Sequence, residues 1–139
     1  MKSTDEAYDE ICYYTLSRGD AEFIHQYVVD AFAAQNATIK DKPIRLAFAL
    51  VGLYLHVEKG FTGREGQRAH MKLAQTRRDW PRFSLPPERG EITSVEVELA
   101  PAGIDRDQMI RAWCESVWRN FTAAQPIIDK LLIEADVLN

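Results

Sequence analysis

The sequence predicts an all-α protein, a compact helical bundle of about six to seven helices around one central apolar helix. Residues 43–60, PIRLAFALVGLYLHVEKG, place apolar side chains around nearly the whole circumference of a helix, which is typical of a helix that other helices surround. Pro43 suits a first helical turn, and Gly60 suits the left-handed residue that follows a helix end. No segment alternates apolar and polar residues as a half-buried strand does. We therefore expect residues of about 43–59 to form the most buried helix.

The residues before the central helix predict two further helices. Ser3 and Glu6 have the spacing of a capping box, in which the two side chains bond each other's backbone N–H at the start of a helix. Gly19 marks the end of this helix. Asp20 is a favourable N-cap residue, so a second helix is expected over about 20–36.

The residues after the central helix predict the rest of the bundle. Two more capping boxes are expected to open a basic helix and a short helix, and they are formed by Thr62 with Glu65 and by Thr93 with Glu96. Asp105 is expected to cap a long helix. Pro126 either kinks that helix or begins a last one.

A proline-rich strap is expected at residues 79–90, DWPRFSLPPERG. This segment holds three of the six prolines, so it cannot form a regular helix. Trp80, Phe83 and Leu85 offer large apolar surfaces within it. We expect an ordered strap that packs Trp80 or Phe83 over a groove between helices.

The composition is that of one globular domain over residues 1–139. Apolar residues make up 46% and charged residues 27% of the chain, which is ordinary for such a domain. No apolar run reaches the length of about 18 residues that a membrane span requires. Cys12 and Cys114 form no CxxC pair, so we expect reduced thiols in a bacterial-type cytoplasm.

One face of the central helix carries a candidate ligand site. Arg45, Gly52 and His56 recur there at helical spacing, and a glycine inside a helix costs roughly 1 kcal/mol relative to alanine. Close approach of another helix is the commoner compensation. The alternative is a small cavity floored by Gly52 and flanked by Arg45 and His56, suited to a small anion.

The second predicted helix adds three polar candidates to this pocket. His25, Asp30 and Gln35 interrupt an apolar sequence and point in three directions at 100° per residue. Gln35 lies on the apolar stripe and His25 borders it, whereas Asp30 lies away from both. Buried polar groups that bond neighbouring backbone are one interpretation, and a site shared with another helix is the other.

Histidines on three predicted helices allow a metal site in principle. His25, His56 and His70 could converge in a bundle core and bind Zn²⁺ or Ni²⁺. The sequence has no HxxxH or HxxE spacing that would fix two ligands locally. We therefore expect that the three histidines do not share a metal ion.

A basic ridge follows the central helix. Arg64, Arg68 and Lys72 stand at successive i, i+4 positions, and aromatic residues follow, so single-stranded nucleic acid is a conceivable partner for residues 64–83. A solvated helix face is the commoner origin of such a ridge. Residues 1–30 hold seven acidic and two basic side chains, and residues 59–82 hold seven basic and two acidic. Partial mutual neutralisation of these segments is the simplest expectation, and the net charge of −4 disfavours nucleic-acid binding.

Four stretches together resemble a known bacterial family of helical proteins, the DUF5946 type. They are FIHQYVVDAFAAQ at 23–35, FALVGLYLHVEKGF at 48–61, RAHMKLA at 68–74 and AWCESVW at 112–118. The resemblance places His25, Asp30 and Gln35 at the family's H-x4-D-A-[FY]-x2-Q motif, and Gly52 in its V-G-L segment. It implies no activity and no catalytic residue. Some relatives carry extra cysteine pairs that this chain lacks.

The leading hypothesis is a cytoplasmic helical domain that acts by binding a protein partner or a small ligand. The chain has no GxSxG, P-loop or GxGxxG motif, so the sequence assigns no catalytic residue and no cofactor. The alternative is a metal-dependent enzyme of helical-bundle type that uses His25, His56 and His70. Nucleic-acid binding through residues 64–83 is the third hypothesis, and a homodimer stays open.

Overall fold

The computed structural model describes residues 2–139, and they form seven α-helices and no strand. A single 3₁₀ turn, Thr122–Ala124, leads into the last helix. The all-α prediction is therefore confirmed. The helices are α1 (Thr4–Leu16), α2 (His25–Gln35), α3 (Pro43–Lys59), α4 (Gly63–Thr76), α5 (Ser94–Leu99), α6 (Ile104–Arg119) and α7 (Gln125–Glu134).

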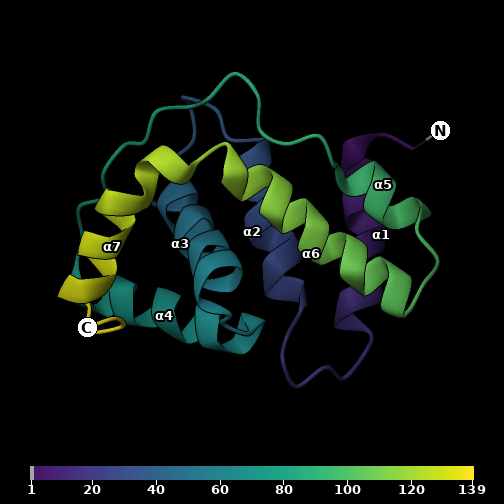
Figure 1. The fold of residues 1–139 in the computed structure, drawn as a ribbon, viewed down its shortest axis with the longest axis horizontal. Coiled ribbons are helices and arrows are strands. Elements are labelled where there is room, and N and C mark those ends of the chain that lie inside the picture. Colours follow the sequence, from purple (N-terminus) through teal and green to yellow (C-terminus); the bar gives the residue numbers. More distant parts are fainter. Residues whose placement is uncertain (1) are drawn as a thin grey trace.

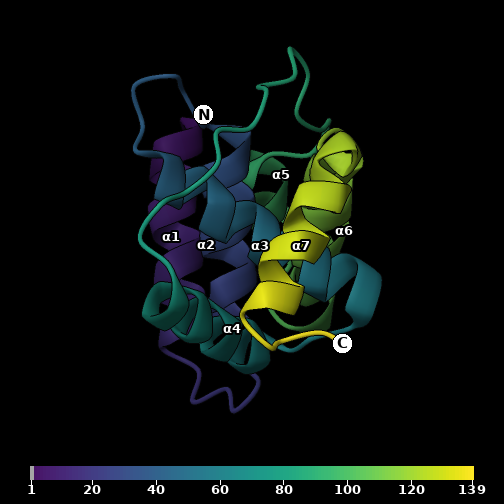
Figure 2. The same cartoon turned by 90° about the vertical axis from the view of Figure 1, so that its left-hand side faces the viewer.

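Helix α3 is the centre of the bundle. It begins at Pro43 and ends before Gly60, whose φ of 70° is left-handed. It packs against α2, α4, α6 and α7, and both views of the fold show it enclosed by them (Figures 1 and 2). Nine of its residues are buried, and these are Leu46, Ala47, Ala49, Leu50, Val51, Gly52, Leu53, Tyr54 and Leu55.

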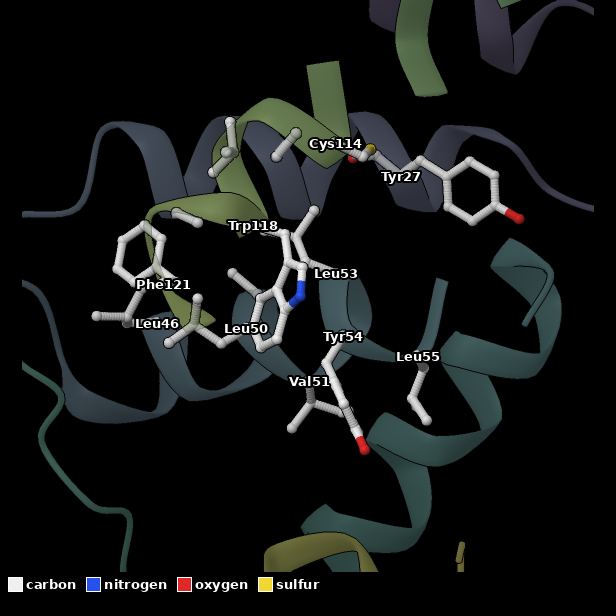
Figure 3. Close-up of a cluster of buried hydrophobic side chains, with 14 of the residues drawn as sticks. Tyr27, Leu46, Leu50, Val51, Leu53, Tyr54, Leu55, Cys114, Trp118 and Phe121 are labelled. Carbon is white, nitrogen blue, oxygen red and sulfur yellow. The ribbon is translucent and has the colours of Figure 1, made fainter. Parts of the chain in front are cut away.

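One part of the apolar core lies where α3 meets α6. Trp113 and Trp118 on α6 are the largest fully buried side chains. Figure 3 shows Trp118 among Leu50, Leu53 and Tyr54 of α3. Burial of such large side chains stabilises the packing of α6 against α3.

All three predicted capping boxes are present. The N-cap hydroxyls of Ser3 and Thr62 accept from the third helical N–H, and that of Thr93 accepts from the N–H of Val95. In all three boxes the glutamate at the third helical position accepts from the N-cap N–H. They therefore satisfy donors that the start of a helix leaves without a partner. The boxes open α1 at Ser3, α4 at Thr62 and α5 at Thr93.

Two predicted helix starts are wrong. Helix α2 begins at His25 and not at Asp20, because Asp20 accepts from the N–H groups of Glu22 and Ile24 and so closes a turn. Phe23 in that turn has a φ of 59°, which no right-handed helix can include. Helix α6 begins at Ile104 after the left-handed Gly103, two residues from the predicted cap.

The strap at 79–90 packs its aromatic side chains against the bundle, as predicted. Trp80 meets the ring of Phe48 on α3 edge-on, with ring centroids 5.1 Å apart. Phe83 and Leu85 also pack against the core. Figures 1 and 2 show the segment leaving α4 and running along the outside of the bundle to α5. Across residues 2–139, no helix combines the length and the apolar character needed to cross a membrane.

Candidate functional site

A buried carboxyl group on α2 is the most unusual polar feature of the bundle. Asp30 is 4% exposed. Its Oδ1 accepts a hydrogen bond of 3.1 Å from Nε2 of Gln26, one helical turn earlier. Because burial removes water from the charged form, the pKa of Asp30 is raised well above its ordinary value, and the bond from Gln26 opposes this rise. The sequence pattern places Asp30 away from the apolar stripe of α2, yet its side chain is buried.

Gly52 on α3 leaves the space that the carboxyl group of Asp30 occupies. A β-carbon on Gly52 would lie 1.8 Å from Oδ2 of Asp30 and 2.5 Å from its Cγ. Non-bonded atoms cannot approach so closely, so any side chain at position 52 would collide with the carboxyl group. The glycine in the middle of α3 is therefore compensated by close approach of α2, and the group that approaches is a carboxyl.

Asp30 lines a cavity of about 450 Å³ at the surface of the bundle. The cavity lies within the size range of ligand sites in proteins. Its walls come from α1, α2, α3 and α4 and combine aliphatic, aromatic and polar side chains. The lining residues are Tyr8, Gln26, Val29, Asp30, Phe32, Ala33, Ile44, Arg45, Phe48, Ala49 and His70.

His70 on α4 brings a defined hydrogen-bonding state to the cavity. Its Nε2 lies 2.7 Å from the backbone oxygen of Phe48. A carbonyl oxygen only accepts, so Nε2 carries the hydrogen and Nδ1 of the neutral ring is an acceptor. The imidazole also stacks on the Phe48 ring, with centroids 4.7 Å apart. Burial lowers the pKa of His70, which favours this neutral form.

The structure divides the predicted site residues into two groups. Asp30 and Arg45 line the cavity, and Gly52 lies against Asp30. The other three, His25, Gln35 and His56, do not line it. Sequence reasoning missed Gln26, Tyr8 and His70 as cavity residues. The i, i+4 spacing of Gln26 and Asp30 was the available signal for the first of these.

Gln35 connects distant parts of the chain. Its Oε1 accepts a 2.9 Å bond from Nε1 of Trp113 on α6. Its Nε2 donates to the backbone oxygens of Arg89 and Ile92, at 3.2 and 2.8 Å. Gln35 therefore fixes the end of the strap against α2 and α6.

The remaining histidines are held separately. Nδ1 of His25 lies 2.9 Å from the hydroxyl oxygen of Thr15 on α1. His56 stacks on the ring of Tyr27, with centroids 3.6 Å apart. Within residues 2–139, no three His, Cys, Asp or Glu side chains gather as a metal site would require.

His56 makes the fold sensitive to acid. Burial lowers its pKa to about 4, a backbone interaction with Phe61 opposes the shift, and the charge of Arg111 adds to it. As the pH falls below about 6.5, the unfolded chain binds a proton at this ring while the folded chain does not, so the free energy of unfolding decreases. Urea unfolding between pH 7 and pH 4 should show His56→Gln losing on the order of 2–3 kcal/mol less than the natural protein. If the difference in free energy of unfolding between the two proteins is the same at pH 7 and pH 4, the prediction is contradicted.

The basic ridge is exposed, as its helical spacing suggests. Arg64, Arg68 and Lys72 all face solvent on α4. The Arg64 guanidinium lies over the ring of Phe23, 4.8 Å from its centroid. Among the described residues, no ion pair joins the acidic segment 2–30 to the basic segment 59–82. Arg77 pairs instead with Glu134 of α7 at 3.0 Å.

The sequence matches the model of a protein family described as a family of unknown function, DUF5946, over residues 3–122. The match covers most of the chain, so the protein belongs to this family. It includes α1 to α6 and with them every residue that lines the Asp30 cavity. No curated protein and no solved structure matches the chain.

Proposed function

We propose that this member of the DUF5946 family binds a small organic molecule in the cavity beside Asp30. One observation carries the proposal: Asp30, an acidic residue that is only 4% exposed, lines a cavity of about 450 Å³. Buried polar groups without a full set of partners are costly to keep. A ligand that bonds the carboxyl would offset this cost.

The walls of the cavity support a small ligand over an inorganic ion. Phe32 and Phe48 contribute aromatic surface, and Val29 and Ile44 contribute aliphatic surface. Ligand sites combine such apolar walls with a few fixed polar groups. Inorganic ions have no apolar surface to bury against these walls.

We also propose a cytoplasmic location, which two free cysteines support. Cys12 is half-buried and Cys114 is buried, and neither forms a disulfide. Burial raises the pKa of both thiols, so neither is activated as a nucleophile. Reduced, inert thiols are typical of proteins in a reducing compartment.

The proposed function is tested by screening neutral aromatic and aliphatic fragments against the labelled protein by NMR. We expect the backbone amide shifts to change mainly at residues that line the Asp30 cavity. A fragment at 100 times its dissociation constant should also stabilise the fold by about 2.7 kcal/mol. Shift changes confined to other surfaces would contradict the proposal.

A matched pair of variants makes this screen specific. Ala33 is half-buried and lines the Asp30 cavity, so Ala33→Leu should fill the cavity and weaken fragment binding. Ala112 is half-buried and lines two other surface hollows near α6, so Ala112→Leu should leave binding unchanged. Equal fragment affinities of Ala33→Leu and the natural protein would also contradict the proposal.

A further inference from the structure

The polar groups of the Asp30 cavity separate into an inner and an outer end. Asp30 is 4% exposed and His70 is 8% exposed, so both belong to the inner end. Arg45 lines the same cavity but is exposed to solvent. Within residues 2–139, Arg45 forms none of the ion pairs. The cavity thus offers an acidic group inside and a cationic group at its mouth.

The inner end has more hydrogen-bond acceptors than donors. Once ionised, the Asp30 carboxyl group only accepts, and the neutral His70 ring accepts at Nδ1 because its Nε2–H bonds the oxygen of Phe48. Gln26 already directs an N–H of its amide to Asp30. A ligand group with several N–H donors complements this end, and an ammonium group has three.

The burial of Asp30 points to the same ligand group. Buried carboxylates in proteins are normally paired with a cation. Among residues 2–139, no cationic side chain lies within ion-pair distance of Asp30. A ligand cation would therefore supply the counter-charge that allows Asp30 to ionise in this buried position. A cation alone would meet repulsion from Arg45 on entry, whereas an anionic group on the same ligand would pair with it.

We infer that the ligand of this cavity is a small zwitterion, an amino compound whose ammonium group binds Asp30 and whose anionic group binds Arg45. The inference rests on the proposed function, since it names the class of molecule for the same site. The apolar body between the two charges packs against Phe32 and Phe48, which also line the cavity.

The inference is tested with two matched sets of probes in calorimetric titrations. One set has an aromatic body and consists of free phenylalanine, phenethylamine and phenylpropionate. The other has an aliphatic body and consists of free leucine, isoamylamine and isocaproate. In at least one set, the zwitterion should bind about tenfold or more tightly than both single-charge analogues, which corresponds to about 1.4 kcal/mol or more.

Two variants test which residue of the protein binds each charged group of the zwitterion. Asp30→Asn should abolish the advantage of the zwitterion over the carboxylate probe, and Arg45→Gln should abolish its advantage over the amine probe. Lys42→Gln is the control, because Lys42 is an exposed cation near the start of α3 that does not line the cavity. It should leave both advantages intact.

The pH dependence of the affinity for the zwitterion provides a second test of the inference. The titratable or charged groups around Asp30 are Tyr8 on α1, Arg45 on α3, His70 on α4 and Cys114 on α6. An ammonium ligand favours ionised Asp30, so the affinity for the zwitterion should rise with pH while Asp30 titrates. In Asp30→Asn this rise should be smaller, because His70 is then the only one of these groups that titrates below neutral pH.

The outcomes separate this inference from the proposed function. If neutral fragments bind the cavity but neither zwitterion outperforms its single-charge analogues, the inference is overturned and the proposed function stands. If neither zwitterion binds at all, the inference is likewise overturned. If no fragment or probe shifts the cavity residues, both fail together.

Discussion

Replacing Leu50 with alanine is expected to lower the free energy of unfolding by about 2–5 kcal/mol. Leu50 is fully buried at the middle of α3, in the cluster with Trp118 that Figure 3 shows. Removal of its branched side chain takes apolar surface out of contact and leaves a cavity that the surrounding helices cannot fully close. Urea unfolding followed by circular dichroism at neutral pH measures this loss.

Leu99→Ala is the matched control for this substitution. Leu99 is the last residue of α5 and is 72% exposed. Exposed substitutions away from special features change stability by about 0.5 kcal/mol or less. A loss below roughly 1 kcal/mol for Leu50→Ala, or equal losses for the two variants, would contradict the central burial of α3.

Elements whose signals are local in sequence could be predicted closely. The central helix was predicted at 43–59 because Pro43 and Gly60 mark its two ends and the apolar residues between them leave no polar face. The capping boxes depend on residues only three positions apart, so the side chains that form them are visible in the sequence. Interactions of this kind need no knowledge of the tertiary fold.

The start of α2 depended on contacts that the sequence does not show. The turn before it docks on the first residues of α4, where Arg64 N–H donates to the backbone oxygen of Glu22 at 2.9 Å. A β-carbon on Gly63 would lie 1.8 Å from the backbone oxygen of Phe23, so this contact requires a glycine. The competing N-cap signal at Asp20 is real, but its carboxyl group caps a turn and not a helix.

The candidate site shows the same division between local and distant signals. The glycine inside α3 marked a close approach correctly, but nothing in the sequence identified the approaching group as Asp30. Helical periodicity assigns faces relative to one apolar stripe. Helix α2 packs against α1, α3, α4 and α6 at once, so a residue outside the main stripe can still be buried. The role of Gln35 depends on partners 54 to 78 residues away.

Gly52→Ala is expected to destabilise the fold by about 2 kcal/mol or more, because the added methyl group collides with a buried carboxyl. Helix propensity alone predicts the opposite sign, a gain of about 0.5–1 kcal/mol. Gly66→Ala on α4 is the matched control. A β-carbon there meets no atom within 4 Å, so the propensity gain should appear unopposed. Chemical unfolding of both variants separates the effect of the collision on the free energy of unfolding from the effect of helix propensity.

A double-mutant cycle then tests whether Asp30 is the cause of the loss at position 52. Asp30→Ala removes both carboxyl oxygens that lie in the path of the added methyl group. In the Asp30→Ala background, Gly52→Ala should therefore cost far less than in the natural protein, with a coupling energy of about 1–3 kcal/mol. Additive losses would mean that the collision involves other atoms. Because the same carboxyl group defines the proposed ligand site, the cycle also measures how tightly that group is held between α2 and α3.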